Sequence, residues 1–402
     1  DQTLNSLREI LNIPVTTFDS EHFLSKRDEL KDFFKGKKSF LMENFYRHLR
    51  AKYALLMKDG KPEQNKWNFD HDNRNKLDAQ TTLIEPKKFN YDVSIIINEI
   101  ESSNISYFGK IDAKHFSWPK NRQDGIELLN YFTKNLLSNF GRYQDAMTYK
   151  HKFLFHSRLS FALNLKLISP LEVCSEAIAA YYKDPLNNSI EQVEGFIRQI
   201  VGWREYMRGV YWSEMPEYKE LNFFNHHNTL PSFFWDGKTE MNCLQHSIGQ
   251  SLEDAYAHHI QRLMVIGNFC LLAGINPDEV DQWYLGVYID AFEWVEITNT
   301  RGMSQYADGG IVGTKPYISS ANYIHKMSVY CKSCSYNYKT KFDDNSCPLN
   351  TLYWDFLMIH ESKLKNNPRM MIPYAALKKL NEQDRKLISE KATKIKLNLN
   401  KL

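Results

Sequence analysis

The segment 252–272 constrains the fold of this chain more than any other. Its residues are good helix formers, acidic residues occupy its first turn, and no Pro interrupts it, so we expect one continuous helix. Its C-terminal half is apolar almost all round, which is typical of a helix buried in a large core. The same helix carries His258, His259 and Arg262, and buried polar groups either pair internally or serve a ligand. His259 and Arg262, three positions apart, can share one face.

Helical patterns cover most of the chain. We expect helices over 5–12, 25–35, 39–57, 93–101, 124–139, 153–166, 170–183, 189–211, 246–272 and 277–290, and a short strand over 13–19. The composition shifts to polar residues with Gly and Pro at 61–92, which is typical of a linker between domains. The sequence therefore predicts a mainly α fold, with an α/β portion at 1–60, a linker at 61–92 and a large helical domain at 93–402.

Composition excludes several classes of protein. Six cysteines in 402 residues, without an apolar N-terminal segment, argue against a secreted disulfide scaffold. No run of 18 uncharged apolar residues exists, so we expect a cytoplasmic, monomeric protein with no membrane partner. A net charge of +3 is too small to indicate nucleic-acid binding by the whole surface. Basic residues are concentrated after Lys363, where they form either a solvated helix face or a set of phosphate contacts.

Three cysteines form a compact motif near the C-terminus. Cys331, Cys334 and Cys347 have the spacing C-x2-C-x12-C, which places three soft ligands in one irregular loop. Such a loop can hold zinc or an iron–sulfur cluster, and either needs a fourth ligand. The remaining cysteines, Cys174, Cys243 and Cys270, are all candidates on sequence alone.

Longer motifs resemble a known family. The run 193–356 contains GFIRQIVGWREYMRGVYW, AYAHHIQRLM and the cysteine motif. It resembles the iron–sulfur bacterial cryptochromes and photolyases, the deoxyribodipyrimidine photolyase-related proteins. The resemblance implies a DNA photolyase, a lyase that uses FAD and blue light to repair (6-4) photoproducts in UV-damaged DNA. It also implies a [4Fe–4S] cluster bound by Cys243, Cys331, Cys334 and Cys347.

The resemblance also assigns a flavin site. The chain has no G-x-G-x-x-G fingerprint, so side chains and helix N-termini would have to bind the dinucleotide. The segment 156–170 resembles the photolyase segment that lines the FAD diphosphate, and WREY resembles the motif beside the folded FAD. Arg262 and Asp290 match the pair against the isoalloxazine, and Glu296 matches the residue that faces flavin N5. The other implied FAD-binding residues are Ser157, Leu159, Ser160, Gln199, Trp203 and Arg204.

Two further groups of residues match roles in the family's reaction. Trp235, Trp283 and Tyr284 match an aromatic path that carries electrons from the surface to photoexcited flavin, although aromatic residues more often only fill the core. His259 matches a histidine that donates a proton to the lesion, a role suited to an unperturbed pKa of about 6.5. The implied lesion pocket is lined by Leu263, Met303 and Tyr317. A second histidine found in eukaryotic (6-4) enzymes is replaced here by Leu263.

Alternatives to repair use some of the same motifs. A cryptochrome-like photoreceptor would bind FAD and signal without repair. A nucleic-acid-binding iron–sulfur protein similar to the primase large subunit would bind no flavin. In related proteins an N-terminal domain binds an antenna lumazine. The motif Gly-Asp-Gln-Leu that would form its pocket is missing here, unless Asp1 and Gln2 are its remnant, so we expect no bound lumazine.

Overall fold

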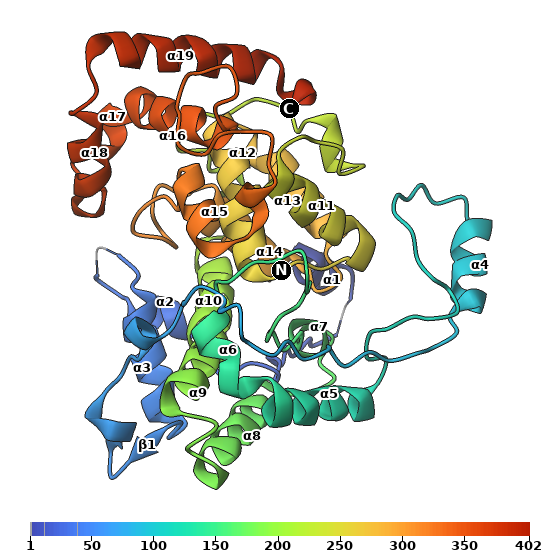
Figure 1. Ribbon diagram of the computed structural model, residues 1–402. Helices are drawn as coiled ribbons and strands as arrows, with labels where there is room; N and C mark the ends of the chain where they lie inside the picture. The colour runs from blue at the N-terminus through green and yellow to red at the C-terminus, as the bar shows by residue number, and fades with distance from the viewer. Residues whose placement is uncertain (1, 12, 38) are drawn as a thin grey trace.

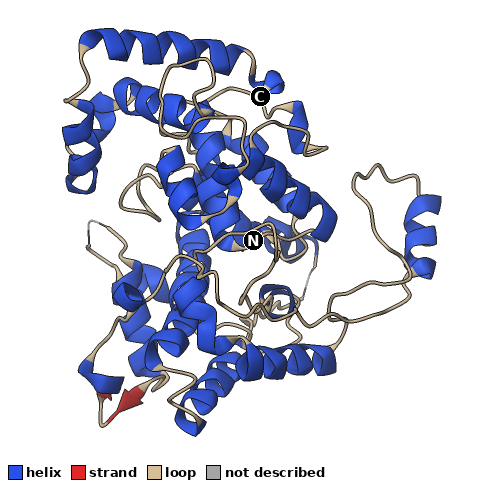
Figure 2. Cartoon of the chain, viewed as in Figure 1, coloured by secondary structure: helices blue, strands red, loops and turns tan. Residues whose placement is uncertain are grey.

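The computed structural model describes residues 2–11, 13–37 and 39–402. Helices dominate this part of the chain (Figure 2). Its strands, β1 (Met57–Lys58) and β2 (Lys61–Pro62), form one antiparallel pair in which Met57 lies opposite Pro62. The predicted mainly α fold is confirmed. Within the described residues, no helix is both long enough and apolar enough to cross a membrane.

Figure 1 shows how the helices are arranged. The first eight are α1 (Gln2–Ile10), α2 (Glu29–Phe33), α3 (Met42–Lys52), α4 (Ser94–Ser102), α5 (Arg122–Asn135), α6 (Leu137–Tyr143), α7 (Ser160–Asn164) and α8 (Pro170–Lys183). The later ones are α9 (Ile190–Ile197), α10 (Glu205–Glu214), α11 (Asn242–Asp254), α12 (Asn268–Ala273), α13 (Pro277–Val287), α14 (Glu293–Ile297), α15 (Ala321–Met327), α16 (Pro348–Ile359), α17 (Glu361–Leu364), α18 (Met371–Leu377) and α19 (Glu382–Leu397). Three π-helices are η3 (Arg198–Arg204), η6 (Gln261–Gly267) and η7 (Thr298–Ser304).

Local sequence explains where several helices begin. The hydroxyl of Ser169 accepts a hydrogen bond from the backbone of Glu172, and the Glu172 side chain accepts one from the backbone of Ser169. This capping box, followed by Pro170, starts α8 at the predicted residue. The side chain of Asn276 accepts a hydrogen bond from the backbone N–H of Asp278 and so caps α13, with Pro277 in its first turn.

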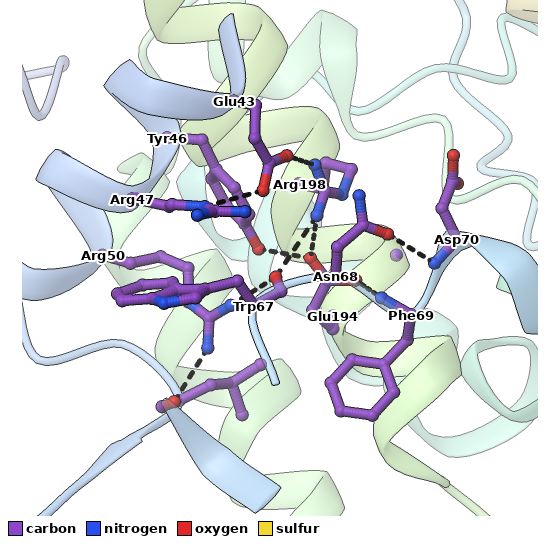
Figure 3. Close-up of polar contacts among 12 residues, drawn as sticks. Glu43, Tyr46, Arg47, Arg50, Trp67, Asn68, Phe69, Asp70, Glu194 and Arg198 are labelled. Atoms are coloured by element: carbon purple, nitrogen blue, oxygen red, sulfur yellow. Dashed lines mark hydrogen bonds and ion pairs between the residues drawn. The ribbon is translucent and has the colours of Figure 1, made fainter. Parts of the chain in front are cut away.

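A buried polar cluster attaches α3 and the chain after β2 to the helical core (Figure 3). The carboxylate of Glu194, which is fully buried, accepts hydrogen bonds from the Tyr46 hydroxyl at 2.7 Å, Arg198 at 2.8 Å and the Phe69 backbone at 3.1 Å. Arg198 also pairs with Glu43 on α3. Because Glu194 and Arg198 lie on the continuous helical run of α9 and η3, these contacts fix α3 and the chain after β2 against one wall of the molecule.

The segment predicted as a linker approaches the core closely at Asn73. A Cβ atom added to Gly141 would lie 2.6 Å from the Asn73 side chain, and one added to Gly195 would lie 2.9 Å from it. Both glycines therefore leave room for Asn73, whose amide donates to the backbone of Glu191. The division of the chain into domains stays a prediction.

The predicted helix over 246–272 is wrong as one element. α11 ends at Asp254, Ala255 adopts a left-handed φ of 50°, and helical backbone resumes only at His259. Alanine favours right-handed helix, so its sequence gives no warning of this break. Contacts with other parts of the chain must hold it.

Other predicted elements also differ from the structure. The helix predicted over 39–57 ends at Lys52, because Ala54 and Leu56 have left-handed φ values of 53° and 49°. The helix over 153–166 is limited to α7, because Leu154 and Arg158 have φ values of 46° and 56° that a right-handed helix excludes. The described residues of 13–19 form no strand, and no strand elsewhere in the described chain lies beside them to supply hydrogen bonds. Residue 12, the predicted end of the first helix, and Asp1 lie outside the described residues.

Candidate active site

A cavity of about 500 Å³ lies among the three π-helices. Each π-helix contributes residues to the lining of the cavity: Gln199, Ile200, Trp203 and Arg204 from η3, Arg262, Leu263 and Met264 from η6, and Asn299, Thr300, Met303 and Ser304 from η7. A π-turn is rare and occurs frequently at functional sites. The volume also falls in the range of small-molecule sites, about 300–1,000 Å³.

The cavity brings together most of the residues singled out from the sequence. Those that line it are Ser157, Leu159, Ser160, Gln199, Trp203, Arg204, His259, Arg262, Leu263, Tyr284, Asp290, Glu296, Met303 and Tyr317. Trp235 and Trp283 do not line it. The set comes from segments up to 160 residues apart, so the fold, rather than local sequence, assembles the site.

The charged centre of the cavity is the pair Arg262 and Asp290. Two guanidinium nitrogens of Arg262 donate to the two carboxylate oxygens of Asp290 at 3.0 and 3.3 Å. The Ser160 hydroxyl donates to Asp290 at 2.6 Å, Arg262 Nε donates to the Ala257 carbonyl at 2.6 Å, and the guanidinium lies 3.7 Å from the centre of the Tyr288 ring. The pair is therefore charge-balanced and held in place by the protein itself.

Glu296 is a second carboxylate in the cavity, and no cation of the described chain contacts it directly. Its side chain accepts a hydrogen bond from the Thr300 hydroxyl at 2.5 Å. Burial raises the pKa of Glu296 to about 7, although the nearby charge of Arg262 opposes the shift. Near neutral pH this carboxyl can therefore either hold or release a proton.

His259 lines the cavity and is an exposed residue, in contrast to the buried His258. Desolvation by the surrounding protein groups and the positive charge of Arg262 lower the pKa of His259 to about 4, so the imidazole is neutral at pH 7 in this state. An anionic group placed beside His259 would raise its pKa again. The histidine is thus suited to take up or release a proton only when a ligand occupies the cavity.

Sequence reasoning did not single out His156, which also lines the cavity. Its ring stacks on that of His258, with 4.5 Å between centroids and 10° between planes. His258 is buried and does not line the cavity, so the two adjacent histidines of the AHHI motif have separate environments. Because His156 and His258 are distant in sequence, no local signal predicts their contact.

The cavity wall also contains donors that the described residues leave unused. Arg204 Nε and Gln144 Nε2 are buried and have no hydrogen-bond partner within the described chain. Arg204 is fixed from the other side, where its guanidinium lies 4.2 Å from the centre of the Phe23 ring. Buried donors without partners are costly, so a ligand that carries acceptor atoms would fit this wall.

Several other residues that line the cavity were not predicted from the sequence. They are Arg74, Asp145, Arg158, Tyr256 and Tyr323, together with Asn299 and Thr300. Burial raises the pKa of Asp145 to about 6, although Arg74 lies 3.9 Å away. Thr300 follows Glu296 by one helical turn, so the i, i+4 spacing could have indicated it. Asn299 and Tyr323 lie on helices, and the others come from loops or from the predicted linker, where no periodicity exists.

The aromatic residues predicted as an electron path lie in order from the surface inward. Trp235 is 48% exposed and directly follows Phe234, whose ring lies 5.2 Å from that of Trp283. Trp283 is buried and lies 5.5 Å from Tyr284, which lines the cavity. The Tyr284 hydroxyl donates to the Arg262 carbonyl at 2.7 Å. The three residues therefore run from exposed to buried, and their role as an electron path stays a prediction.

The four cysteines predicted as ligands line a second, small pocket. The members of this cysteine pocket are Cys243, Cys331, Cys334 and Cys347, with Met241, Ala321, Ile324, Tyr330, Tyr336, Tyr338 and Leu349 around them. Cys243 lies in the first turn of α11, far in sequence from the other three. Cys174 and Cys270 are buried elsewhere and do not line the pocket.

The chemistry of the cysteine pocket suits a soft cation or cluster. Burial, together with the negative charges of the other three thiolates, holds the pKa of Cys243 well above its usual range. A bound cation would remove this repulsion and let all four thiols ionise. In the described chain, no three side chains of His, Cys, Asp or Glu are arranged so that they could hold a metal ion.

Comparisons with known proteins give one family match and several structural matches. Residues 1–116 match the family model described as deoxyribodipyrimidine photo-lyase-related protein. In solved structures, a bacterial class III photolyase from Agrobacterium tumefaciens is 16% identical, with 70% of this chain and 57% of that chain covered and a TM-score of 0.45. A cryptochrome from Synechocystis is 14% identical, with 67% of this chain and 51% of that chain covered and a TM-score of 0.40.

A curated relative gives a much closer match. A protein named (6-4) photolyase, from Agrobacterium fabrum, is 47% identical over 386 residues. The alignment covers 94% of this chain and 75% of that protein. At this identity over nearly the whole chain, the two proteins share a family, so this chain belongs to the family of photolyase-related proteins that contains that (6-4) photolyase.

Proposed function

We propose that this protein repairs (6-4) photoproducts in UV-damaged DNA, in a light-driven reaction that uses FAD in the cavity. The observation that carries the proposal is the 47% identity to a protein named (6-4) photolyase, in a chain whose cavity is lined by the implied flavin and lesion residues. When bound and reduced, FAD supplies an electron to the lesion after it absorbs blue light. The chain's own residues bind, orient and move protons.

The Arg262 and Asp290 pair would hold the flavin ring. Arg262 is fixed by four contacts that do not involve a ligand, so its position is set before FAD binds. Glu296, whose pKa is about 7, would face flavin N5 and exchange a proton there. The unused Nε of Arg204 would donate to an acceptor of the cofactor. The other proposed FAD contacts are Ser157, Leu159, Ser160, Gln199 and Trp203.

His259 would donate a proton to the lesion. In this state it is neutral, so it must first gain the proton, and the negative charge that the lesion receives would favour this uptake. Leu263, Met303 and Tyr317 would line the space beside it. A base of DNA has to leave the helical stack to reach such a cavity, as is general for enzymes that act on bases.

A pair of cations beside Tyr317 would meet the DNA backbone. Arg369 donates to the Thr314 hydroxyl at 2.6 Å, and Lys315 follows Thr314 directly. Neither cation pairs with a carboxylate in the described chain, and burial together with the charge of Arg369 lowers the pKa of Lys315. Two adjacent cations without a counter-ion favour an anion such as a phosphate.

The other parts of the proposal concern electrons and iron. Trp235, Trp283 and Tyr284 would conduct electrons from the surface to the cavity and so return FAD to its reduced form. Four thiolates around a buried, mostly apolar pocket are the donor set of a [4Fe–4S] cluster, which the cysteine pocket would hold.

Replacement of His259 tests the proposed chemistry. His259→Asn should leave FAD bound and photoreducible but lower (6-4) repair by about 10²–10⁴, the usual contribution of an acid–base group. His258→Asn is the matched control, because it changes the neighbouring histidine, which does not line the cavity. We expect this control to lose stability and keep most of its repair per folded molecule. Repair by His259→Asn at the parent rate would show that His259 is a packing residue.

A further inference from the structure

The irregular segment 255–258 carries part of the cavity wall. It connects α11 to the helical backbone that begins at His259. Tyr256 and Ala257 line the cavity within it, and His259 follows directly. Outside a regular helix, each buried peptide group needs a partner elsewhere. The position of His259 therefore depends on whatever holds these four residues.

Two buried glutamines hold the segment. Gln250 Nε2 donates to the Tyr256 carbonyl at 3.3 Å, and the His258 backbone N–H donates to Gln261 Oε1 at 3.1 Å. Gln261 Nε2 in turn donates to Gln250 Oε1 at 2.9 Å. Gln250 is 6% exposed and Gln261 is 1% exposed, so water does not compete for these bonds. The two amides replace the helical hydrogen bonds that this stretch lacks.

The same amides connect to the cysteine pocket. Gln261 Nε2 also lies 3.4 Å from the hydroxyl of Tyr330, which is 1% exposed and lines the cysteine pocket. Tyr330 directly precedes Cys331, and its carbonyl accepts a hydrogen bond from the Asn242 side chain at 2.7 Å. Asn242 directly precedes Cys243. Tyr330 is thus anchored to both chain segments that supply the cysteines.

We propose that Gln261 is a positioning residue for His259 and that, through Tyr330, it couples the geometry of the cysteine pocket to the cavity. The coupling runs from the cysteine segments through the Tyr330 hydroxyl and the Gln261 amide to the backbone of His258. Its effect on repair rests on the proposed function, but its effect on the backbone does not. A glutamine that only filled space could be replaced by Leu without consequence for the backbone.

Amide hydrogen exchange in the holoprotein tests the connection without reference to activity. Gln261→Leu should make the peptide spanning 255–260 exchange about tenfold faster, the loss expected for one buried hydrogen bond. Tyr330→Phe, which removes only the hydroxyl, should give a smaller increase of about threefold in the same peptide. Tyr336→Phe is the matched control, because Tyr336 lines the same pocket and its hydroxyl makes no hydrogen bond in the described chain. It should leave this peptide unchanged.

Repair kinetics separate positioning from a general loss of structure. Gln261→Leu should lower the rate of repair at saturating DNA at least tenfold while dark affinity for a lesion-bearing duplex changes less than twofold. Gln261→Glu keeps the acceptor for the His258 N–H and loses the donors to Gln250 and Tyr330, so it should recover part of that rate. A merely structural residue would lower affinity, rate and flavin content together.

The outcomes decide the proposal unambiguously. Unchanged exchange over 255–260 in both Gln261→Leu and Gln261→Glu overturns the positioning role. An effect of Gln261→Leu without any effect of Tyr330→Phe overturns the coupling to the cysteine pocket. Faster exchange in both Gln261→Leu and Tyr330→Phe supports the proposal, even if the parent protein repairs no lesion. A parent protein that repairs no lesion would contradict only the proposed function.

Discussion

The cavity and the cysteine pocket are both buried and both contain ionisable groups, but only the cavity contains groups of opposite charge that balance one another. In the cavity, the charge of Arg262 is balanced by Asp290, and the surplus hydrogen-bonding capacity lies in unused donors such as Arg204 Nε. In the cysteine pocket, the four thiols would all carry negative charge if they ionised, and the lining residues supply no cation, so ionisation is unfavourable without a ligand. The cavity can therefore keep its shape without a ligand, whereas the four thiols need a bound cation before they can all ionise.

This difference predicts how each site responds to loss of its ligand. A preorganised cavity binds its cofactor reversibly, because the protein groups already hold their positions. Sites made of deprotonated cysteines couple binding to folding, because the ligand stabilises groups that otherwise repel one another. Removal of FAD should thus leave a folded protein, and removal of iron should not.

The largest effect is expected in the cysteine pocket. Cys243→Ser should lose the iron and most of the soluble protein, because the pocket links α11 to the loop that carries the other three cysteines. Iron content and soluble yield are the measurements. Cys174→Ser is the control, since Cys174 is buried but does not line the pocket. Iron loss in the control would contradict the assignment of the four ligands.

A smaller effect is expected when the charge balance of the cavity is broken. Asp290→Asn leaves Arg262 buried without its counter-charge, which should lower the free energy of unfolding by about 3–5 kcal/mol. FAD content should fall as well, because the guanidinium loses its bidentate partner. Chemical denaturation and flavin absorbance measure the two changes. Unchanged flavin content and stability would mean that the pair is not the structural centre of the cavity.

Glu296 should make stability depend on pH. Because burial raises its pKa from 4.5 to about 7, the folded protein binds more protons than the unfolded chain between these values. This contribution favours the folded state at pH 5 and is lost as the pH rises through 7, a change of about 3 kcal/mol. Glu296→Gln should abolish it, so the variant should gain stability relative to the parent at pH 8. The exposed control Glu176→Gln should show no such gain.

The smallest effect is expected at the cations outside the cavity. Lys315→Ala and Arg369→Ala should each reduce the slope of log affinity for duplex DNA against log salt by about 1, the loss of one phosphate contact. Rates of repair at saturating DNA should stay near the parent value. Lys386→Ala, an exposed change on α19, is the control. If the salt slopes of Lys315→Ala and Arg369→Ala equal that of the parent protein, neither residue contacts a phosphate.

Much of the fold and the lining of the site can be predicted from sequence. Caps such as Ser169 and Asn276 mark where helices begin, and family motifs name the residues that the structure gathers around one cavity. Both kinds of signal are local in sequence. Caps can be predicted because the interaction that starts a helix lies within four residues of the start.

The remaining features depend on distant contacts. The break at Ala255 is stabilised by Gln250, Gln261 and the backbone of Ile289, none of which marks residue 255 in a local pattern. The stacking of His156 on His258 joins residues about a hundred positions apart. Periodicity and propensity describe single elements, so they cannot predict which loop supplies a partner to another element.

Illumination of a duplex that carries one (6-4) photoproduct tests the central claim most directly. Purified protein with its flavin reduced should restore the two original pyrimidines under blue light and leave the lesion intact in the dark. A duplex with a cyclobutane dimer is the control lesion and should remain unrepaired. If the flavin photoreduces normally but the (6-4) lesion persists in the light, repair is not the function, and a flavin photoreceptor without repair activity would account for the cavity.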